Sequence, residues 1–93
     1  ERGVERAELV IEVLSPYDES RQKLPWYAKR RVTEVWLVEP KTRVVEVYSL
    51  SAEDYRLVDP IENSTGSPLL RIRLEVVEGP ALRIHDGDAF TDV

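Results

Sequence analysis

The sequence of 93 residues contains no cysteine, no methionine and only one histidine. Without cysteine, disulfide bonds and thiolate metal sites are excluded, and one histidine cannot build a multi-histidine metal centre or a Cys–His nucleophile pair. No apolar run approaches the ~20 residues that a membrane span needs. The first residues, ERGVERAE, do not resemble a signal segment. We therefore expect a cytoplasmic protein that does not associate with membranes.

Positive charge is also scarce, because 13 Lys and Arg against 18 Asp and Glu give a net charge of −5. This balance argues against nucleic-acid binding by bulk electrostatics. The positive charge is concentrated, however: residues 17–32 carry +3 and the remainder carries −8. A basic helix on an acidic body can contact phosphate, although a solvated helix face is the more common meaning of such a run.

The hydrophobic pattern begins with a strand at residues 7–14, which is apolar on both faces except at Glu12. Such runs are typical of central strands covered on both sides. A helix over about residues 22–32 follows, because Pro25 must lie in a first helical turn. The helix face that should pack on the sheet consists of Leu24, Tyr27, Ala28 and Val32.

The rest of the chain reads as strands joined by short turns. Residues 33–39 are apolar on both sides, and residues 43–50 place Val45 and Val47 opposite Glu46 and Tyr48. The remaining expected segments are a short edge strand (55–58), a loop (59–68), a half-exposed strand (69–78), a short strand (81–85) and a fraying tail whose Asp86-Gly87-Asp88 forms a turn. The fold class is therefore α/β: one domain, residues 1–93, with a mixed sheet and one main helix.

Glu12 is the centre of the one constellation that suggests chemistry. A carboxylate inside an apolar strand needs a partner, and Lys23 and Tyr27 follow at the start of the helix. A strand carboxylate can ligate Mg²⁺ while a nearby lysine stabilises charge on a phosphate. Asp18 or Glu8 would supply the second carboxylate. The alternative is purely structural, with Glu12 paired to Lys23 or Arg21.

Residues 7–50 span the first three expected strands and begin AELVIEVLSPYDESRQKLPWYAKRRVTEVWLVEPKTRVVEVY. They resemble the second half of the bacterial Uma-two family of restriction-endonuclease-like proteins. The shared features are the EVLSP strand end, a lysine four residues before Tyr27, and the following EVWLVEP. The resemblance implies part of a restriction-endonuclease-like core with a PD-(D/E)XK site. It implies Mg²⁺ bound by Glu12 and Asp18, catalysis by Glu12 and Lys23, and DNA contacts from Arg30 and Arg31.

The sequence departs from the family pattern in three places. The family's first metal-binding aspartate belongs to an earlier strand that precedes the matched region, and its Pro-Asp dipeptide is Ala7-Glu8 here. The glycine that usually ends the helix is Arg31. Two functions follow as hypotheses: a Mg²⁺-dependent nuclease acting on DNA, or a non-catalytic interaction module in which Glu12 and Lys23 form only an ion pair.

Two further expectations concern packing. Trp26 and Trp36 are expected in the core or against the helix rather than as base-stacking platforms. An open edge at residues 8–14, and a second at 69–78, would favour a homo-oligomer through strand pairing. The apolar faces of residues 44–47 and 70–76 would then be buried between copies.

Overall fold

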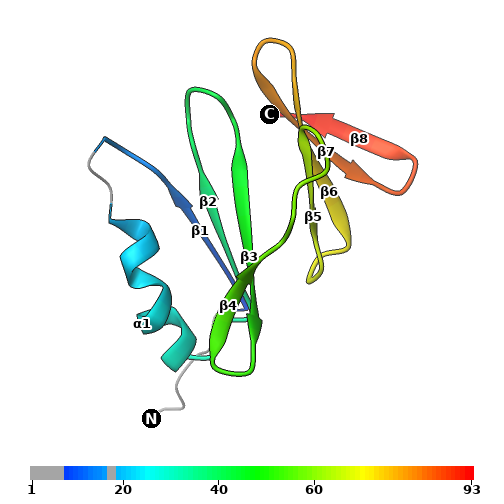
Figure 1. Ribbon diagram of the computed structural model, residues 1–93. Coiled ribbons are helices and arrows are strands. Elements are labelled where there is room, and N and C mark those ends of the chain that lie inside the picture. Colours follow the sequence, from blue (N-terminus) through cyan, green and yellow to red (C-terminus); the bar gives the residue numbers. More distant parts are fainter. Residues whose placement is uncertain (1–7, 17–18) are drawn as a thin grey trace, which may run out of the picture.

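The computed structural model describes residues 8–16 and 19–93. Within these residues the chain forms two four-stranded sheets, one α-helix and one short 3-10 helix (Figure 1). In chain order the elements are β1 (Leu9–Val13), the 3-10 helix η1 (Ser20–Lys23), α1 (Leu24–Lys29), β2 (Glu34–Val38), β3 (Val45–Ser51), β4 (Asp54–Leu57), β5 (Ser64–Ser67), β6 (Ile72–Val77), β7 (Ala81–Asp86) and β8 (Ala89–Asp92).

The first sheet, which we call sheet A, has the strand order β1-β2-β3-β4. β1 and β2 are parallel, with Glu12 opposite Leu37, and the helical segment connects them. The predicted strand–helix–strand unit is therefore confirmed. β2, β3 and β4 continue as antiparallel hairpins, with Leu37 opposite Glu46. Glu12, Leu37 and Glu46 thus form one row across the sheet.

The second sheet, sheet B, is an antiparallel meander in the order β5-β6-β7-β8. Sheet A is mixed, as predicted, but the later strands form a separate sheet instead of extending it. The expected loop at 59–68 contains β5, and the tail expected to fray forms β8. Asp86 pairs with Ala89, so Gly87 and Asp88 form the predicted turn, with Gly87 at φ 63°. Pairing with β7 fixes the tail even though half of its residues are Asp or Thr.

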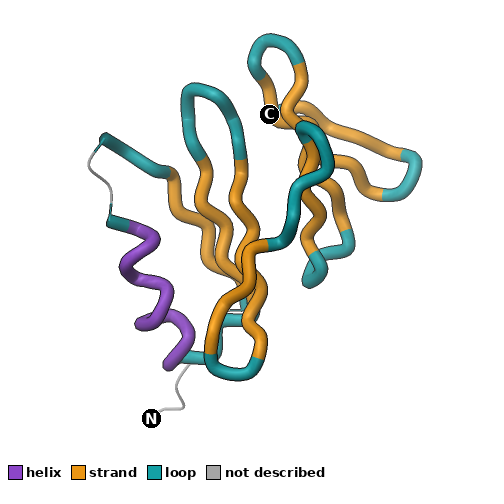
Figure 2. The backbone as a smooth tube through the Cα atoms, viewed as in Figure 1, coloured by secondary structure: helices purple, strands orange, loops and turns teal. Residues whose placement is uncertain are grey.

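Sheet A lies between α1 and sheet B, as Figures 1 and 2 show. Its alternating side chains supply two separate cores. The core between the sheets consists of Trp36, Val45, Val47, Leu74 and Leu82. The core under the helix consists of Val32, Val35 and Leu37, packed by partly buried neighbours that include Leu24 and Tyr27. The predicted facing of β2 and β3, and the predicted packing face of the helix, are confirmed.

β1 is an edge strand among the described residues, not the central strand that its apolar run predicted. Ile11 and Val13 are 52% and 62% exposed on the face opposite α1. Leu9, on the same face, packs against the core between the sheets. Sheet B therefore covers the start of β1 and leaves its end open. The apolar run predicted a strand covered on both faces along its whole length, but the second face is covered only at Leu9.

The helix is shorter than the predicted span of 22–32 and ends through a Schellman motif. The Val32 amide donates to the Tyr27 carbonyl at 3.2 Å, and the Arg31 amide donates to the Ala28 carbonyl at 3.0 Å. Arg31 takes φ 59°, the left-handed conformation that favours glycine. Position 31, where the resemblance described above implies a glycine, is thus the helix-terminating residue. Val32 completes the packing face from beyond the helix.

Several predicted surfaces have other roles in the fold. Trp36 is buried as expected, but Trp26 is 52% exposed, so its assignment to the core is wrong. β6 lies between β5 and β7 and offers no edge. Val45, Val47 and Leu74 pack together within one chain and so are not free to meet a second copy. No helix in the described part of the chain is long and apolar enough to cross a membrane.

Candidate functional site

Glu12 lies on the face of sheet A that η1 and α1 cover. Its neighbours Ile11 and Val13 point to the opposite face, and the side chain of Glu12 is 17% exposed. The chain leaves β1 at Ser15-Pro16 and returns over this face as η1. The carboxylate therefore sits beneath a helical turn from the same chain while keeping a narrow access to solvent.

Three side chains donate hydrogen bonds to the Glu12 carboxylate. The Ser20 hydroxyl lies 3.1 Å from Oε1, and the Lys23 ammonium lies 3.3 Å from the same oxygen. The Tyr27 hydroxyl donates to Oε2. The structure therefore brings together Glu12, Lys23 and Tyr27 as the sequence predicted. Ser20, which is fully buried, was missed.

The position of Ser20 could have been read from spacing had the turn type been known. A 3-10 helix has three residues per turn, so residues three apart lie on the same side. Ser20 and Lys23 have this spacing in η1, and Tyr27 follows one α-helical turn after Lys23. The predicted α-helix began at about residue 22 and so excluded Ser20. The three-residue spacing that puts Ser20 on the same side as Lys23 was therefore not recognised.

These contacts shift the pKa values of Glu12 and Tyr27 in opposite directions. The pKa of Glu12 lies below its usual value, mainly because Tyr27 donates to the ionised form. Burial opposes this effect, and Ser20 and Lys23 reinforce it. Burial, together with the bond to Glu12, raises the pKa of Tyr27 to about 12. At neutral pH the site is thus a carboxylate anion with a protonated phenol, which suits an ion ligand or an anchor better than a general base.

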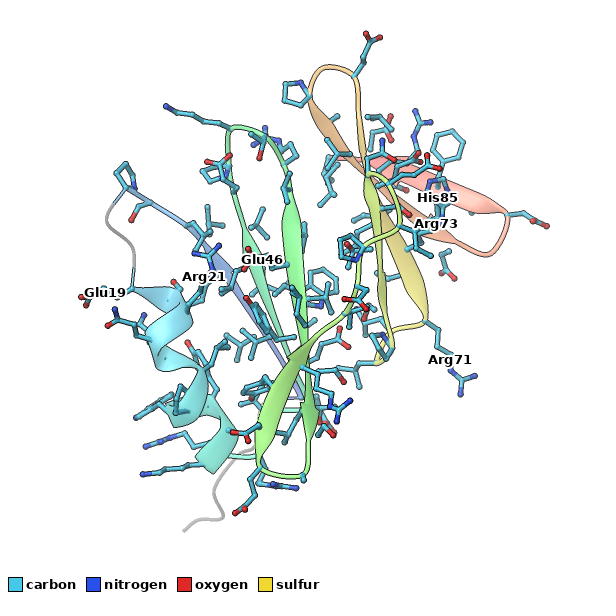
Figure 3. All side chains as sticks on the ribbon, in the orientation of Figure 1. Glu19, Arg21, Glu46, Arg71, Arg73 and His85 are labelled. Atoms are coloured by element: carbon cyan, nitrogen blue, oxygen red, sulfur yellow. The ribbon has the colours of Figure 1, made fainter. Side chains whose placement is uncertain are left out.

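A second carboxylate on the same face holds the other side of η1. Arg21 makes a bidentate contact with Glu46, with Nε at 3.0 Å from Oε1 and Nη2 at 2.7 Å from Oε2. The Tyr48 hydroxyl donates to Glu46 at 2.8 Å. Figure 3 shows Arg21 reaching from η1 toward Glu46, while Glu19 points away. The sequence predicted that Glu46 and Tyr48 share one face of their strand. It did not predict that Arg21 would bind Glu46, because that contact depends on where η1 lies.

Burial alone would raise the pKa of Glu46, but the bonds from Arg21 and Tyr48 outweigh it and hold the pKa below its usual value. Glu12 and Glu46, separated by Leu37 in one row, therefore both remain ionised. Both carboxylates bind side chains of the same four-residue turn. The pair fixes η1 over sheet A, which is what places Lys23 at the carboxylate.

The two predicted DNA-contacting arginines occupy different surroundings. Arg30 lies over the Trp26 ring, with Cζ 3.5 Å from the ring centroid, and donates to the Trp26 carbonyl at 3.3 Å. Arg31 donates to the carbonyl of Ala52, in the β3–β4 turn, at 2.6 Å. Both are exposed. Arg30 therefore remains on the outer surface of α1, while Arg31 ties the helix end to sheet A.

The described residues do not by themselves fit a Mg²⁺ ion. No group of three or more His, Asp or Glu side chains that could hold a metal occurs within residues 8–16 and 19–93. Asp18, the predicted second ligand, lies outside these residues. Glu8 is four strand residues from Glu12, which corresponds to roughly 13 Å along β1, and it accepts a hydrogen bond from Thr33 instead. A single carboxylate surrounded by three donors is an incomplete magnesium site.

Comparison with known proteins identifies a family. Residues 1–81 match the model of the Uma2 family, described as "Putative restriction endonuclease". Neither a search of curated proteins nor a search of solved structures gave a significant match. The matched range includes Glu12, Ser20, Lys23 and Tyr27, so the whole carboxylate cluster belongs to the part of the chain that the family describes.

Proposed function

This chain belongs to the Uma2 family, and from that premise we propose that it carries a restriction-endonuclease-like site that cleaves DNA phosphodiesters. The observation that carries the proposal is the Glu12–Lys23 pair at 3.3 Å beneath η1. A carboxylate held ionised beside an ammonium is the pairing that phosphodiester cleavage of the PD-(D/E)XK type uses.

Each member of the cluster has a distinct role in the proposal. Tyr27 and Ser20 orient the Glu12 carboxylate and keep it ionised. The Lys23 side chain is 55% exposed, and an ion pair this open is weak. Its ammonium can therefore exchange Glu12 for a phosphate oxygen of DNA. Arg30 and Arg31, which are exposed near the helix end, contact the nucleic-acid backbone.

Metal binding in this proposal needs a second carboxylate. Mg²⁺ is held through carboxylate oxygens and water and would supply Lewis acidity at the phosphate when bound. Asp18 is the candidate within the chain. No other described strand pairs with the outer edge of β1, and another strand with an acidic residue would lie beside Glu12 at this edge.

The test is cleavage of plasmid and duplex DNA with Mg²⁺ or Mn²⁺ by matched variants. We expect Glu12→Gln and Lys23→Ala each to lower the rate by about a hundredfold or more. The controls are Glu19→Gln and Lys29→Ala, which change exposed residues of the same segment and should leave the rate unchanged. Cleavage that persists in Glu12→Gln would contradict the proposal.

The hydrogen bonds that the Glu12 carboxylate already accepts favour a second function. Because three protein donors already bind its carboxylate, the cluster also suits a non-catalytic module in which the pair only fixes η1. In that case Glu12→Gln changes stability alone, and neither metal binding nor cleavage depends on it. Isothermal titration with Mn²⁺ separates the two functions, since specific binding that Glu12→Gln abolishes supports the nuclease.

Both functions are compatible with assembly of copies through the β1 edge. The edge of β1 that is unpaired among the described strands is a template for pairing, and Ile11 and Val13 expose apolar surface on the same strand. We expect a dimer or a larger assembly by light scattering, weakened when Ile11 and Val13 are both replaced by lysine. A compact monomer at high micromolar concentration would argue against this assembly.

A further inference from the structure

The two tryptophans of the chain have opposite environments. Trp36 is 6% exposed and its indole nitrogen donates to Glu34 at 2.6 Å, whereas Trp26 is 52% exposed on the outer surface of α1. A single exposed apolar side chain is ordinary. Trp26 differs because an arginine lies over its ring, and because it contacts Tyr27 of the candidate site.

The surroundings of Trp26 form a defined aromatic and cationic group. Arg30, one helical turn later, places its guanidinium carbon 3.5 Å from the ring centroid. On another side the indole meets the Tyr27 ring edge-on, with centroids 5.2 Å apart and planes at 80°. The hydroxyl of Tyr27 binds Glu12. Trp26 is therefore one side chain away from the carboxylate of the proposed site.

The helical segment that carries this group is positively charged. Residues 20–31 contain five Lys and Arg and no Asp or Glu. Arg21 and Lys23 are paired with Glu46 and Glu12. The Arg30 guanidinium, by contrast, contacts only the Trp26 ring and carbonyl among the interactions of the described residues. Its positive charge thus remains available beside an exposed aromatic surface.

We propose that Trp26 and Arg30 form a nucleobase-stacking site, in which an unpaired base stacks on the indole and Arg30 binds the adjoining phosphate. The proposal rests on the proposed function, because it supposes a nucleic-acid substrate. Aromatic side chains stack on any base through its π-face, and arginine adds charge and cation–π contact. Such a site next to Glu12 and Lys23 would hold a frayed or single-stranded stretch close to the scissile phosphate.

The competing explanation is that Arg30 and Trp26, four residues apart, only stabilise the short helix. A base-dependent measurement separates the two. Fluorescein-labelled oligothymidylate and an abasic deoxyribose-phosphate oligomer of equal length carry the same phosphates, but only the first has bases to stack. Anisotropy titrations at one fixed salt concentration give both affinities.

We expect the wild-type protein to bind the thymidylate about tenfold more tightly than the abasic oligomer. Trp26→Ala should remove this difference and leave abasic binding unchanged, while Trp26→Phe should restore part of it. Arg30→Gln should weaken both oligomers, and Arg56→Gln, an exposed arginine on β4, should weaken neither. Quenching of tryptophan emission by thymidylate should disappear in Trp26→Ala, where only buried Trp36 remains.

Equal binding of the two oligomers by wild type, or unchanged thymidylate affinity in Trp26→Ala, would overturn the stacking site and leave the nuclease proposal standing. A lower melting temperature of Trp26→Ala together with unchanged affinity would assign the pair to helix stability instead. Failure of the wild-type protein to bind any oligonucleotide would overturn both the stacking site and the proposed function.

Discussion

The covered face of sheet A and the open face of sheet B carry similar carboxylates in different settings. Glu12 on β1 lies under η1 and α1, whereas Glu75 on β6 accepts a hydrogen bond from His85 at 2.7 Å, with Arg73 at 3.7 Å. In Figure 3, Arg73 and His85 lie together on sheet B with no helix over them. Both carboxylates have a pKa below the usual value, through Tyr27 in one case and His85 in the other.

The difference lies in where the partners come from. On sheet B the partners of Glu75 belong to its own strand or to the neighbouring β7, so they follow from strand register alone. On sheet A the three donors to Glu12 come from a helical layer placed over the strand. A second layer encloses the carboxylate and brings in hydroxyl groups that no adjacent strand supplies. Enclosure, more than residue type, makes sheet A the candidate site.

The largest effect should come from the residue that joins the two sheets. Glu34 is 1% exposed and accepts hydrogen bonds from Trp36, from Ser67 on β5, and from the Leu69 amide at 3.0 Å. Glu34→Ala leaves these donors buried without an acceptor, so we expect a loss of about 3–5 kcal/mol. Urea denaturation measures it, with exposed Glu53→Ala as control. A loss comparable to the control would mean that the sheets hold together without this carboxylate.

The second prediction concerns the stability that Tyr27 gives to the covered face of sheet A at high pH. Tyr27 has a folded pKa of about 12, above its ordinary value of 10.0. The folded state therefore holds this proton more tightly, and the stabilisation is complete below pH 10 and lost as the pH rises toward 12. We expect a loss of roughly 1–2 kcal/mol over this range. Absorbance at ~295 nm should show one tyrosine titrating near pH 12, absent in Tyr27→Phe. Its persistence in that variant would refute the assignment.

The third prediction compares the two carboxylates directly. Glu12→Gln removes the charge that three donors share, and we expect it to lower the free energy of unfolding by about 1–2 kcal/mol at pH 7. Glu75→Gln, on the open face, should have a smaller effect. Because the folded pKa of Glu12 is depressed below 4.5, its stabilisation is present above pH 4.5 and is lost as the pH falls further. Equal effects of both substitutions would remove the distinction between the faces.

The smallest effect concerns backbone conformation at one turn of each region. Arg31 and Gly87 both have positive φ, 59° and 63°. Arg31→Gly relieves the left-handed strain but loses the bond to Ala52, so we expect a gain of about 0.5 kcal/mol. Gly87→Ala, where a Cβ would meet nothing within 4 Å, should cost about 1 kcal/mol from conformation alone. Thermal melts measure both, and a destabilised Arg31→Gly would show that the Ala52 contact dominates.

Prediction from the sequence worked best where one periodicity governs a segment. The facing of β2 and β3 and the packing of Leu24, Tyr27 and Ala28 were confirmed because burial repeats with the period of the strand or helix. β5 was missed because its STGS sequence has no apolar alternation. Thr65 and Ser67 are nevertheless buried, since β6 pairs with this segment and Glu34 accepts from Ser67.

The sequence by itself determined the strand–helix–strand unit, the placement of Pro25 in the first turn of the helix, and the meeting of Glu12 with Lys23 and Tyr27. The turn at Pro25 follows from a local steric rule, and the three donors to Glu12 lie within 15 residues of it along the chain. Only the tertiary structure decided that β1 is an edge among the described strands, that sheet B forms and covers sheet A, and that Trp26 faces solvent. It also decided that Arg21 reaches Glu46, 25 residues away. Contacts between layers depend on how whole elements stack, and one strand's pattern of burial does not specify which element will cover it.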